Sequence, residues 1–303
     1  MKRITSKTRG LFTLLLALTW IAHGAAAPEP PEVASLKSAL QQLKFQTGDV
    51  TLPGGLAKLS LPEGFRYLTP GDADVVLTKL WGNPPGHETL GMVFPAGMGP
   101  ATTNGWAIVI TYSDDGYIKD SDADSIDYDQ LLQQMQTSTK ATNAERKKSG
   151  FPTVDLVGWA ARPHYDKAAH KMYWAKELKF EDNDDHTLNY NIRVLGRGGV
   201  LNLNAVASLS ALPAIEASVP QIVALVNFTD GNRYADFKEG TDKVAAYGLA
   251  ALVAGGFAAK AGFFKVLIAG LIAAKKFIII GLIAVAGLLK KLLSGRNRPN
   301  PGA

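Results

Sequence analysis

The alternation of apolar and polar side chains in the second half of the chain predicts a run of β-strands. Four segments carry this pattern: Val154–Ala161, Lys171–Phe180, Leu188–Leu195 and Val200–Ala207. In the third segment the odd-numbered positions Asn189, Asn191 and Arg193 are polar, whereas the even-numbered positions are apolar or aromatic. A period of two with one polar side is typical of an antiparallel sheet that has one face on the core and one in water.

Weaker patterns elsewhere complete an α+β domain. Residues on either side of Pro53–Gly55 predict a hairpin over 50–61, which 64–68 extend. The spacing of Asp127 and Gln130 is that of a capping box and predicts a helix to about Lys147. The other predicted elements are a helix over 72–80, strands over 89–94 and 106–112, and a helix over 211–226. We expect the fold class α+β, with a mainly antiparallel sheet of about six strands flanked by helices.

The N-terminus has the pattern of an export signal. Residues 1–27 begin with basic side chains, continue with an apolar run over 11–22 and end in small residues, as a secretory signal peptide does. The apolar run is shorter than the roughly 20 residues that cross a bilayer. An uncleaved N-terminal anchor is the alternative, and either arrangement exports the domain at 49–230. A proline-rich entry at 28–48 joins the two.

The C-terminus predicts a membrane anchor after a polar linker at 231–243. The apolar residues 244–264 would form a helix of about 31 Å at ~1.5 Å per residue, which matches a hydrocarbon core of ~30 Å. A second apolar segment, 266–289, has two adjacent lysines near its middle, each costing ~2.5–3.5 kcal/mol there. Three arrangements therefore compete within 244–303: one span followed by an interfacial helix in the basic tail 265–303, a two-span hairpin, or two interfacial segments. A buried helical hairpin of a soluble fold is a fourth alternative.

Charge is segregated along the chain. The net charge is +5, but the basic groups of residues 1–27 and 260–303 have no acids beside them, so the part between is acidic. This pattern excludes a nucleic-acid binder and favours a basic tail on anionic lipid. Six lysines are predicted to contact the lipid bilayer: Lys260, Lys265, Lys275, Lys276, Lys290 and Lys291. The positive-inside rule then places the tail in the cytoplasm and the body in the periplasm, at a bacterial inner membrane.

An acidic loop is the sharpest candidate for a metal site. Asp120, Asp122 and Asp124 have the 1, 3, 5 spacing of a calcium loop. The sixth and twelfth positions are Ser125 and Leu131, where an EF-hand has glycine and glutamate, so an EF-hand is not predicted. A looser carboxylate site is the alternative to a solvated loop, which we favour.

No catalytic residue or cofactor is predicted. The chain has no cysteine, which excludes disulfides, thiolate metal sites and a cysteine nucleophile. His164 and His170 lie six residues apart and form a weak metal signal, and no nucleophile elbow or phosphate-binding loop occurs. Arg193 and Arg197 are candidates for binding an anion, although we favour simple exposure to solvent as the explanation for both. Four tryptophans are candidates for a ligand groove or for the core: Trp81, Trp106, Trp159 and Trp174.

Several stretches resemble a known family when they are taken in order. They are residues 52–67, 80–86, 115–120, 173–178, 188–197 and 242–248. The chain resembles bacterial membrane-anchored proteins of the domain of unknown function 2167, over roughly residues 45–265. The resemblance implies an exported domain with a C-terminal anchor and implies no activity and no functional residues. The order of strands and helices is also similar to that of PsbP-like sandwiches, as an analogy of fold alone.

Two hypotheses about function follow. The first is a membrane-anchored interaction or structural module of the envelope, with an envelope protein as its unknown partner. The second is an envelope enzyme or a small-ligand or metal-binding module. It would use the Asp120–Asp124 loop, or Arg193 together with the tryptophans.

Overall fold

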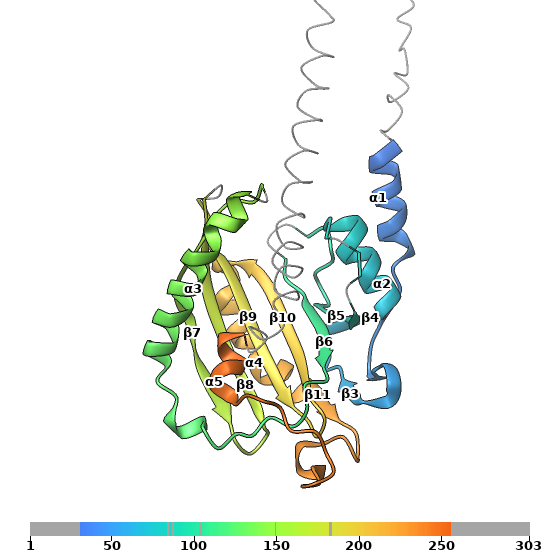
Figure 1. The fold of residues 1–303 in the computed structure, drawn as a ribbon. Helices are drawn as coiled ribbons and strands as arrows, with labels where there is room; N and C mark the ends of the chain where they lie inside the picture. The colour runs from blue at the N-terminus through green and yellow to red at the C-terminus, as the bar shows by residue number, and fades with distance from the viewer. Residues whose placement is uncertain are drawn as a thin grey trace, which may run out of the picture.

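The computed structural model describes residues 31–83, 85–86, 88–102, 105–148, 150–181 and 184–255. The predicted signal peptide, the basic tail and the six lysines expected on lipid lie outside these residues. The domain is α+β, as the sequence predicts (Figure 1).

The main sheet is antiparallel and has eight strands in the order β1-β4-β5-β6-β10-β9-β8-β7. Their bounds are Phe45–Gln46 (β1), Phe65–Leu68 (β4), Thr89–Pro95 (β5), Ile108–Ser113 (β6), Val154–Asp166 (β7), Lys171–Phe180 (β8), Thr187–Leu195 (β9) and Val200–Ser208 (β10). All four strands predicted from the alternation are confirmed. The expected number of about six was too low, because the short strands β1 and β4 add to one edge.

A second sheet of three strands lies beside it, in the order β11-β3-β2. The predicted hairpin is confirmed as β2 (Asp49–Thr51) and β3 (Ala57–Ser60), joined by the turn Pro53–Gly55; β11 (Val226–Phe228) pairs with β3. The expected extension of this hairpin by residues 64–68 was wrong. Gly64 has a φ of +98°, which turns the chain, and the following strand β4 pairs with β1 and β5 in the main sheet.

Five α-helices surround the sheets in the described part of the chain. They are α1 (Pro31–Gln42), α2 (Pro70–Asp74), α3 (Tyr128–Lys148), α4 (Leu212–Leu225) and α5 (Leu249–Ala254). A π-helical segment, Val75–Leu80, continues α2. The predicted cap of α3 is present, because the Asp127 carboxylate accepts hydrogen bonds from the backbone N–H groups of Asp129 and Gln130, each at 3.0 Å.

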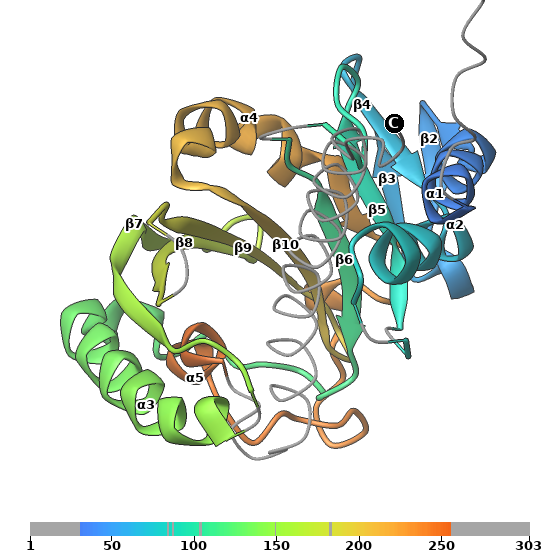
Figure 2. The ribbon, with the colours of Figure 1, turned by 90° about the horizontal axis from the view of Figure 1, so that it is seen from above.

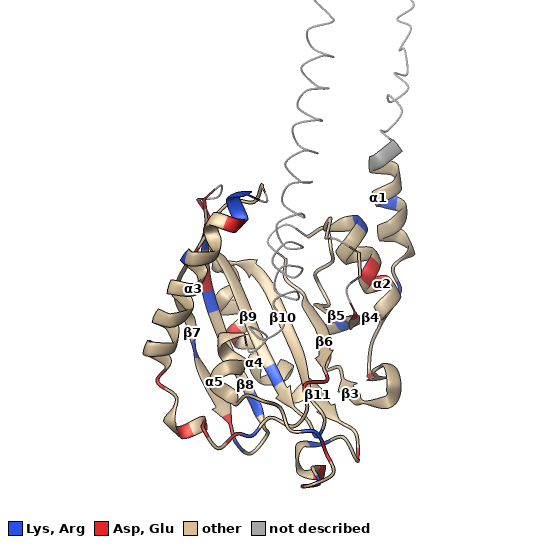
Figure 3. Ribbon diagram, viewed as in Figure 1, with Lys and Arg blue, Asp and Glu red and all other residues tan. Residues whose placement is uncertain are grey.

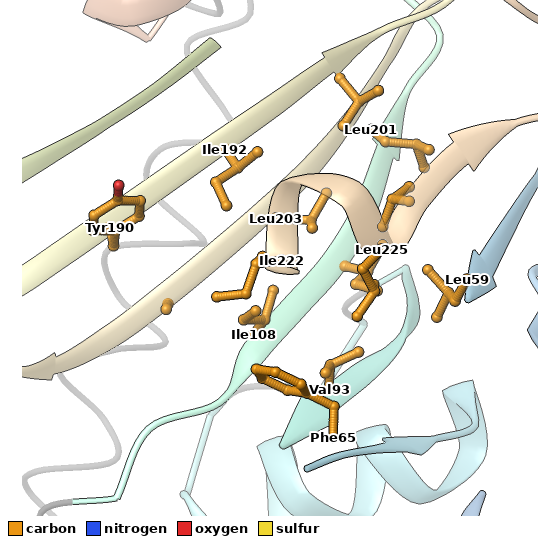
Figure 4. Packing of buried hydrophobic residues seen from close by; sticks show 14 of the residues in the cluster. Leu59, Phe65, Val93, Ile108, Tyr190, Ile192, Leu201, Leu203, Ile222 and Leu225 are labelled. Carbon is orange, nitrogen blue, oxygen red and sulfur yellow. The ribbon is translucent and has the colours of Figure 1, made fainter. Parts of the chain in front are cut away.

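The two faces of the main sheet are covered differently. One face, which we call the α4 face, packs on α4 and the three-stranded sheet through a large apolar cluster that includes Leu59, Ile192 and Ile222 (Figure 4). The opposite face, the α3 face, has α3 and α5 over its β7–β8 side and α2 over its β4–β5 side. Figure 2 shows α4 and the α3–α5 pair on opposite sides of the curved sheet.

Residues 231–255 differ from expectation. The segment expected as a linker packs on the domain, and Val244, expected to begin a membrane helix, forms a parallel bridge with Tyr117. Helix α5 begins only at Leu249 and ends at Ala254, before Gly255 with its φ of +99°. Among the described helices, none is both long and apolar enough to cross a bilayer. Residues 256–264 and 266–289 of the predicted spans lie outside the described residues.

Candidate functional site

Between the α3–α5 pair and α2, the middle of the α3 face carries polar side chains, and no described helix packs on it. We call it the polar strip, and it consists of Lys176 on β8, Asn189, Asn191 and Arg193 on β9, and Asn202 and Asn204 on β10. Strand register brings these side chains together: Arg193 lies opposite Asn202, Asn191 opposite Asn204, and Asn189 opposite Lys176. Side chains directly opposite each other in an antiparallel pair share a face and interact. The predicted polar face of β9 is therefore confirmed.

A chain of hydrogen bonds crosses the strip in one direction. The Arg193 Nη2 donates to the Asn191 Oδ1 at 3.1 Å, the Asn191 Nδ2 donates to the Asn189 Oδ1 at 2.7 Å, and the Asn189 Nδ2 donates to the Asn204 Oδ1 at 3.3 Å. A guanidinium has only donors, so Arg193 sets the orientation of every amide after it. The chain ends on the Oδ1 of Asn204, so the Nδ2 of the same amide is a further donor on the strip.

Two buried polar atoms at the strip have no hydrogen-bond partner. They are the indole Nε1 of Trp174 and the Oδ1 of Asn202, whose own Nδ2 donates to the Ser113 hydroxyl at 2.9 Å. Trp174 lies on β8 opposite Asn191, and the Arg193 guanidinium is stacked over its ring, 5.1 Å from the centroid. Buried polar atoms are paired in native proteins with few exceptions, so each of these two atoms is available to a water or a ligand.

The strip is also cationic (Figure 3 shows basic positions in blue on the central strands). Within the described residues, the half-buried Lys176 makes no hydrogen bond and no ion pair, and Arg193 pairs with no carboxylate. Burial, and then the neighbouring Arg193, lower the pKa of Lys176 to about 8. Burial likewise lowers the pKa of Arg193 to about 10. Lys176 and Arg193 are therefore two partly buried cations that form no ion pair with a described carboxylate.

Lys171, five residues earlier on β8, is a buried lysine whose ammonium group has hydrogen-bond acceptors. It points to the α4 face, is 5% exposed and donates to the carbonyl oxygens of Val223 and Val226 at 2.5 and 2.9 Å. A third bond reaches the Asn227 side chain at 3.2 Å. These oxygens lie at the C-terminal end of α4, where a cation is favourable. Lys171 is a helix cap, whereas Lys176 has no such partner.

The family is decided by a comparison with models of protein families. The match covers residues 44–286 and is described as protein of unknown function, DUF2167. The chain belongs to the DUF2167 family. This confirms the family resemblance inferred from the sequence.

Solved structures and curated proteins add little to this assignment. The solution structure of cyanobacterial PsbP (CyanoP) from Synechocystis sp. PCC 6803 matches with a TM-score of 0.33 and 7% identity, covering 62% of this chain and 92% of that chain. A point mutant of protein Mog1 matches with a TM-score of 0.30 and 9% identity, covering 62% of this chain and 97% of that chain. TM-scores of this size carry no argument about this DUF2167 chain. A search of the curated proteins finds no match.

The three aspartates of the predicted calcium loop have three separate partners in this DUF2167 domain. The Asp120 carboxylate accepts from the Tyr165 hydroxyl at 2.8 Å, and Asp122 caps α5 by accepting from the backbone N–H groups of Leu249 and Ala250. Asp124 is exposed and forms a pair with Lys167 at 3.6 Å. Nowhere in the described ranges do three or more histidine and acidic side chains form a group suited to a metal ion.

Asp120 instead joins a cluster that the sequence did not reveal. The Tyr165 hydroxyl lies 3.2 Å from the Nδ1 of His170, which is 3.7 Å from the Asp120 carboxylate. Burial and the bond to Asp120 raise the pKa of Tyr165, which keeps the phenol neutral. His170 has a left-handed φ of +51° and packs on Tyr234 at 4.1 Å. Its predicted companion His164 packs elsewhere, on the ring of Tyr173.

The other candidate residues have structural contacts. Arg197 binds both carboxylate oxygens of Asp242, at 2.7 and 2.8 Å, and this lowers the pKa of Asp242 to about 2. Trp106 lies in the core of the α4 face, while the indoles of Trp81 and Trp159 donate to backbone carbonyls. Of the predicted anion and groove residues, Arg193 and Trp174 are the two that the fold brings together.

Proposed function

We propose that this DUF2167 chain is a membrane-anchored binding module of the bacterial cell envelope. Its body faces the periplasm, its basic tail lies at the cytoplasmic side of the inner membrane, and an envelope protein or an envelope ligand is its partner. The segregated charge and the predicted signal peptide support this location. The observation that carries the proposal is the way in which residues 231–255 are built into the body.

Three contacts fix this segment. The Arg197–Asp242 pair holds its first half, and the parallel bridge between Tyr117 and Val244 holds its middle. The Asp122 carboxylate caps α5, whose residues Leu249, Leu252 and Val253 are buried against the sheet. Because residues 231–255 are packed on the body, they do not form a flexible tether, and this suits a docking or scaffolding role.

Fractionation and reporter fusions test the proposal. Bacteria would express the full chain, or a chain ending at Gly255, each with alkaline phosphatase fused at its C-terminus. We expect the full chain to stay in the membrane pellet after a carbonate wash and the shorter chain to be released as a soluble, active periplasmic fusion. A full chain that the carbonate wash removes, or a shorter chain without phosphatase activity, would contradict the proposal.

A second candidate is an envelope enzyme that uses the Asp120–Tyr165–His170 cluster. The left-handed backbone of His170 favours it, because strained residues concentrate at functional sites. Tyr165→Phe and His170→Asn test it, since asparagine adopts this backbone conformation readily. If both variants restore the phenotype of a null strain as well as the wild type does, this candidate fails.

A further inference from the structure

The polar strip has more hydrogen-bond donors than the described residues around it have acceptors. Within the part of the chain that the structure describes, no acceptor meets the three N–H groups of the Lys176 ammonium or the one of the Trp174 indole. Arg193 uses one N–H on the Ile192 carbonyl and one on Asn191, and its other N–H groups have no acceptor among the described residues. A surface of this kind is complementary to a group that has several acceptor oxygens and a negative charge.

The strip is pre-organised for such a group. Stacking on Trp174 and the bond to Asn191 hold the plane of the Arg193 guanidinium, whose fork matches a carboxylate or phosphate. All members stand on three adjacent central strands, so loop movement is not needed to bring them together. The apolar clusters under α3–α5 and α2 flank the strip and exclude water from its sides.

From this geometry we infer that the polar strip is an oxyanion-binding site, in which Lys176, Arg193 and Trp174 hold the phosphate or carboxylate group of a ligand. The unpaired Asn202 Oδ1 would accept from a hydroxyl group next to the anionic group. The inference rests on the proposal that the body is a binding module, and it does not depend on the membrane anchor.

A purely structural role for Lys176 does not account for its surroundings. The fold gives Lys171 three oxygen acceptors on the other face of the same strand, so it can satisfy a buried lysine. On the α3 face it instead places a second cation, Arg193, near Lys176. Two neighbouring cations, Lys176 and Arg193, without an acidic partner among the described residues lower the free energy of unfolding. Charged groups that are kept despite such a loss of stability are typical of binding sites.

The test uses the full chain in neutral detergent, with inorganic phosphate, glycerol phosphate and acetate as soluble probes. Nanodiscs that contain phosphatidylglycerol or phosphatidylcholine then distinguish a lipid headgroup from a free solute. Binding is measured by calorimetry and by Trp fluorescence at pH 7. The variants are Lys176→Met and Arg193→Gln, and the matched control is Lys179→Met, which removes an exposed lysine from the same strand.

We expect at least one soluble probe or the phosphatidylglycerol disc to bind the wild type and the control alike. Binding should weaken at least tenfold in each site variant, and wild-type binding should weaken as the pH rises through 8. Binding only to phosphatidylglycerol would assign the oxyanion to a lipid, and binding to a soluble probe would assign it to a solute. The inference is overturned if no probe binds, or if both site variants bind as tightly as the control. Membrane fractionation of the same variants should be unchanged, so failure here differs from failure of the proposed function.

Discussion

Replacing Lys176 with methionine should make the folded protein more stable, although it removes a charge from the candidate site. Methionine keeps most of the apolar stem and removes an ammonium group for which the described residues provide no acceptor. A fall in the pKa from 10.5 to about 8 corresponds to about 3 kcal/mol of unfavourable free energy in the charged form. Because a long side chain relaxes toward water, we expect about 1–2 kcal/mol of this to be regained.

The gain should depend on pH, with a sign that follows from proton linkage. The folded chain releases the Lys176 proton near pH 8, whereas the unfolded chain keeps it to about pH 10.5. Between these values the unfolded state binds more protons, so the wild type becomes more stable as the pH rises. The advantage of Lys176→Met should therefore be full below pH 7 and should shrink between pH 8 and pH 10.

Urea unfolding of the full chain in neutral detergent, followed by tryptophan fluorescence at pH 6.5 and pH 9.5, measures both effects. Lys179→Met is the control and should leave the unfolding free energy unchanged, because that lysine is exposed. The reasoning is refuted if Lys176→Met destabilises the chain at pH 6.5. It is also refuted if its advantage is the same at both pH values.

Three further predictions concern the contacts that hold the body together. Lys171→Met should destabilise the chain by about 2–4 kcal/mol in urea unfolding, because it leaves two buried carbonyl groups at the end of α4 without a donor. Asp242→Asn should lower the melting temperature at pH 7 and have a smaller effect at pH 2, because a depressed pKa gives stability that is present above pH 3.8 and is lost as the pH falls through about 2. Gly116→Ala should detach residues 243–245, since its φ is +105° and a Cβ would lie 2.7 Å from the Lys243 carbonyl oxygen; faster amide exchange of Ala245 than in the wild type would show this, and unchanged exchange would contradict it.

Periodicity predicted the long strands of the main sheet, but it missed β1 and assigned β4 to the wrong sheet. Strands β7 to β10 each span nine or more residues, enough for a period of two to show in the sequence. Strand β1 has two residues and β4 has four, and their pairing depends on partners far along the chain. Long-range pairing of this kind leaves no local signal, which is why the sheet has more strands than expected.

The C-terminal boundary was misplaced because composition does not distinguish a membrane helix from a buried one. The uncharged run after Lys243 predicts the start of a membrane span. In the folded domain Leu249, Leu252 and Val253 follow the i, i+3, i+4 spacing of a helix that packs one side on a core. Because this stripe is embedded in a segment of small apolar residues, it does not stand out in the sequence.

The candidate site could be predicted only in part. Arg193 was expected on a polar face and Trp174 in the core or in a groove, yet neither pattern revealed that the Arg193 guanidinium lies over the Trp174 ring. Their contact depends on the pairing register of β8 and β9, which places Trp174 opposite Asn191. The cluster of Asp120 with His170 could not be predicted for a similar reason. It joins a loop and the end of a strand that are far apart in the sequence.

The register also explains why one strand carries two lysines with opposite roles. Positions 171 and 176 differ in parity, so a regular strand points one to the α4 face and the other to the α3 face. On the α4 face the end of α4 supplies carbonyl oxygens, and Lys171 becomes part of the core. The α3 face supplies Arg193 and an indole N–H, which are donors like Lys176 itself. The fold thus supplies acceptor oxygens for the Lys171 ammonium. For the Lys176 ammonium, the ligand that we propose would supply them.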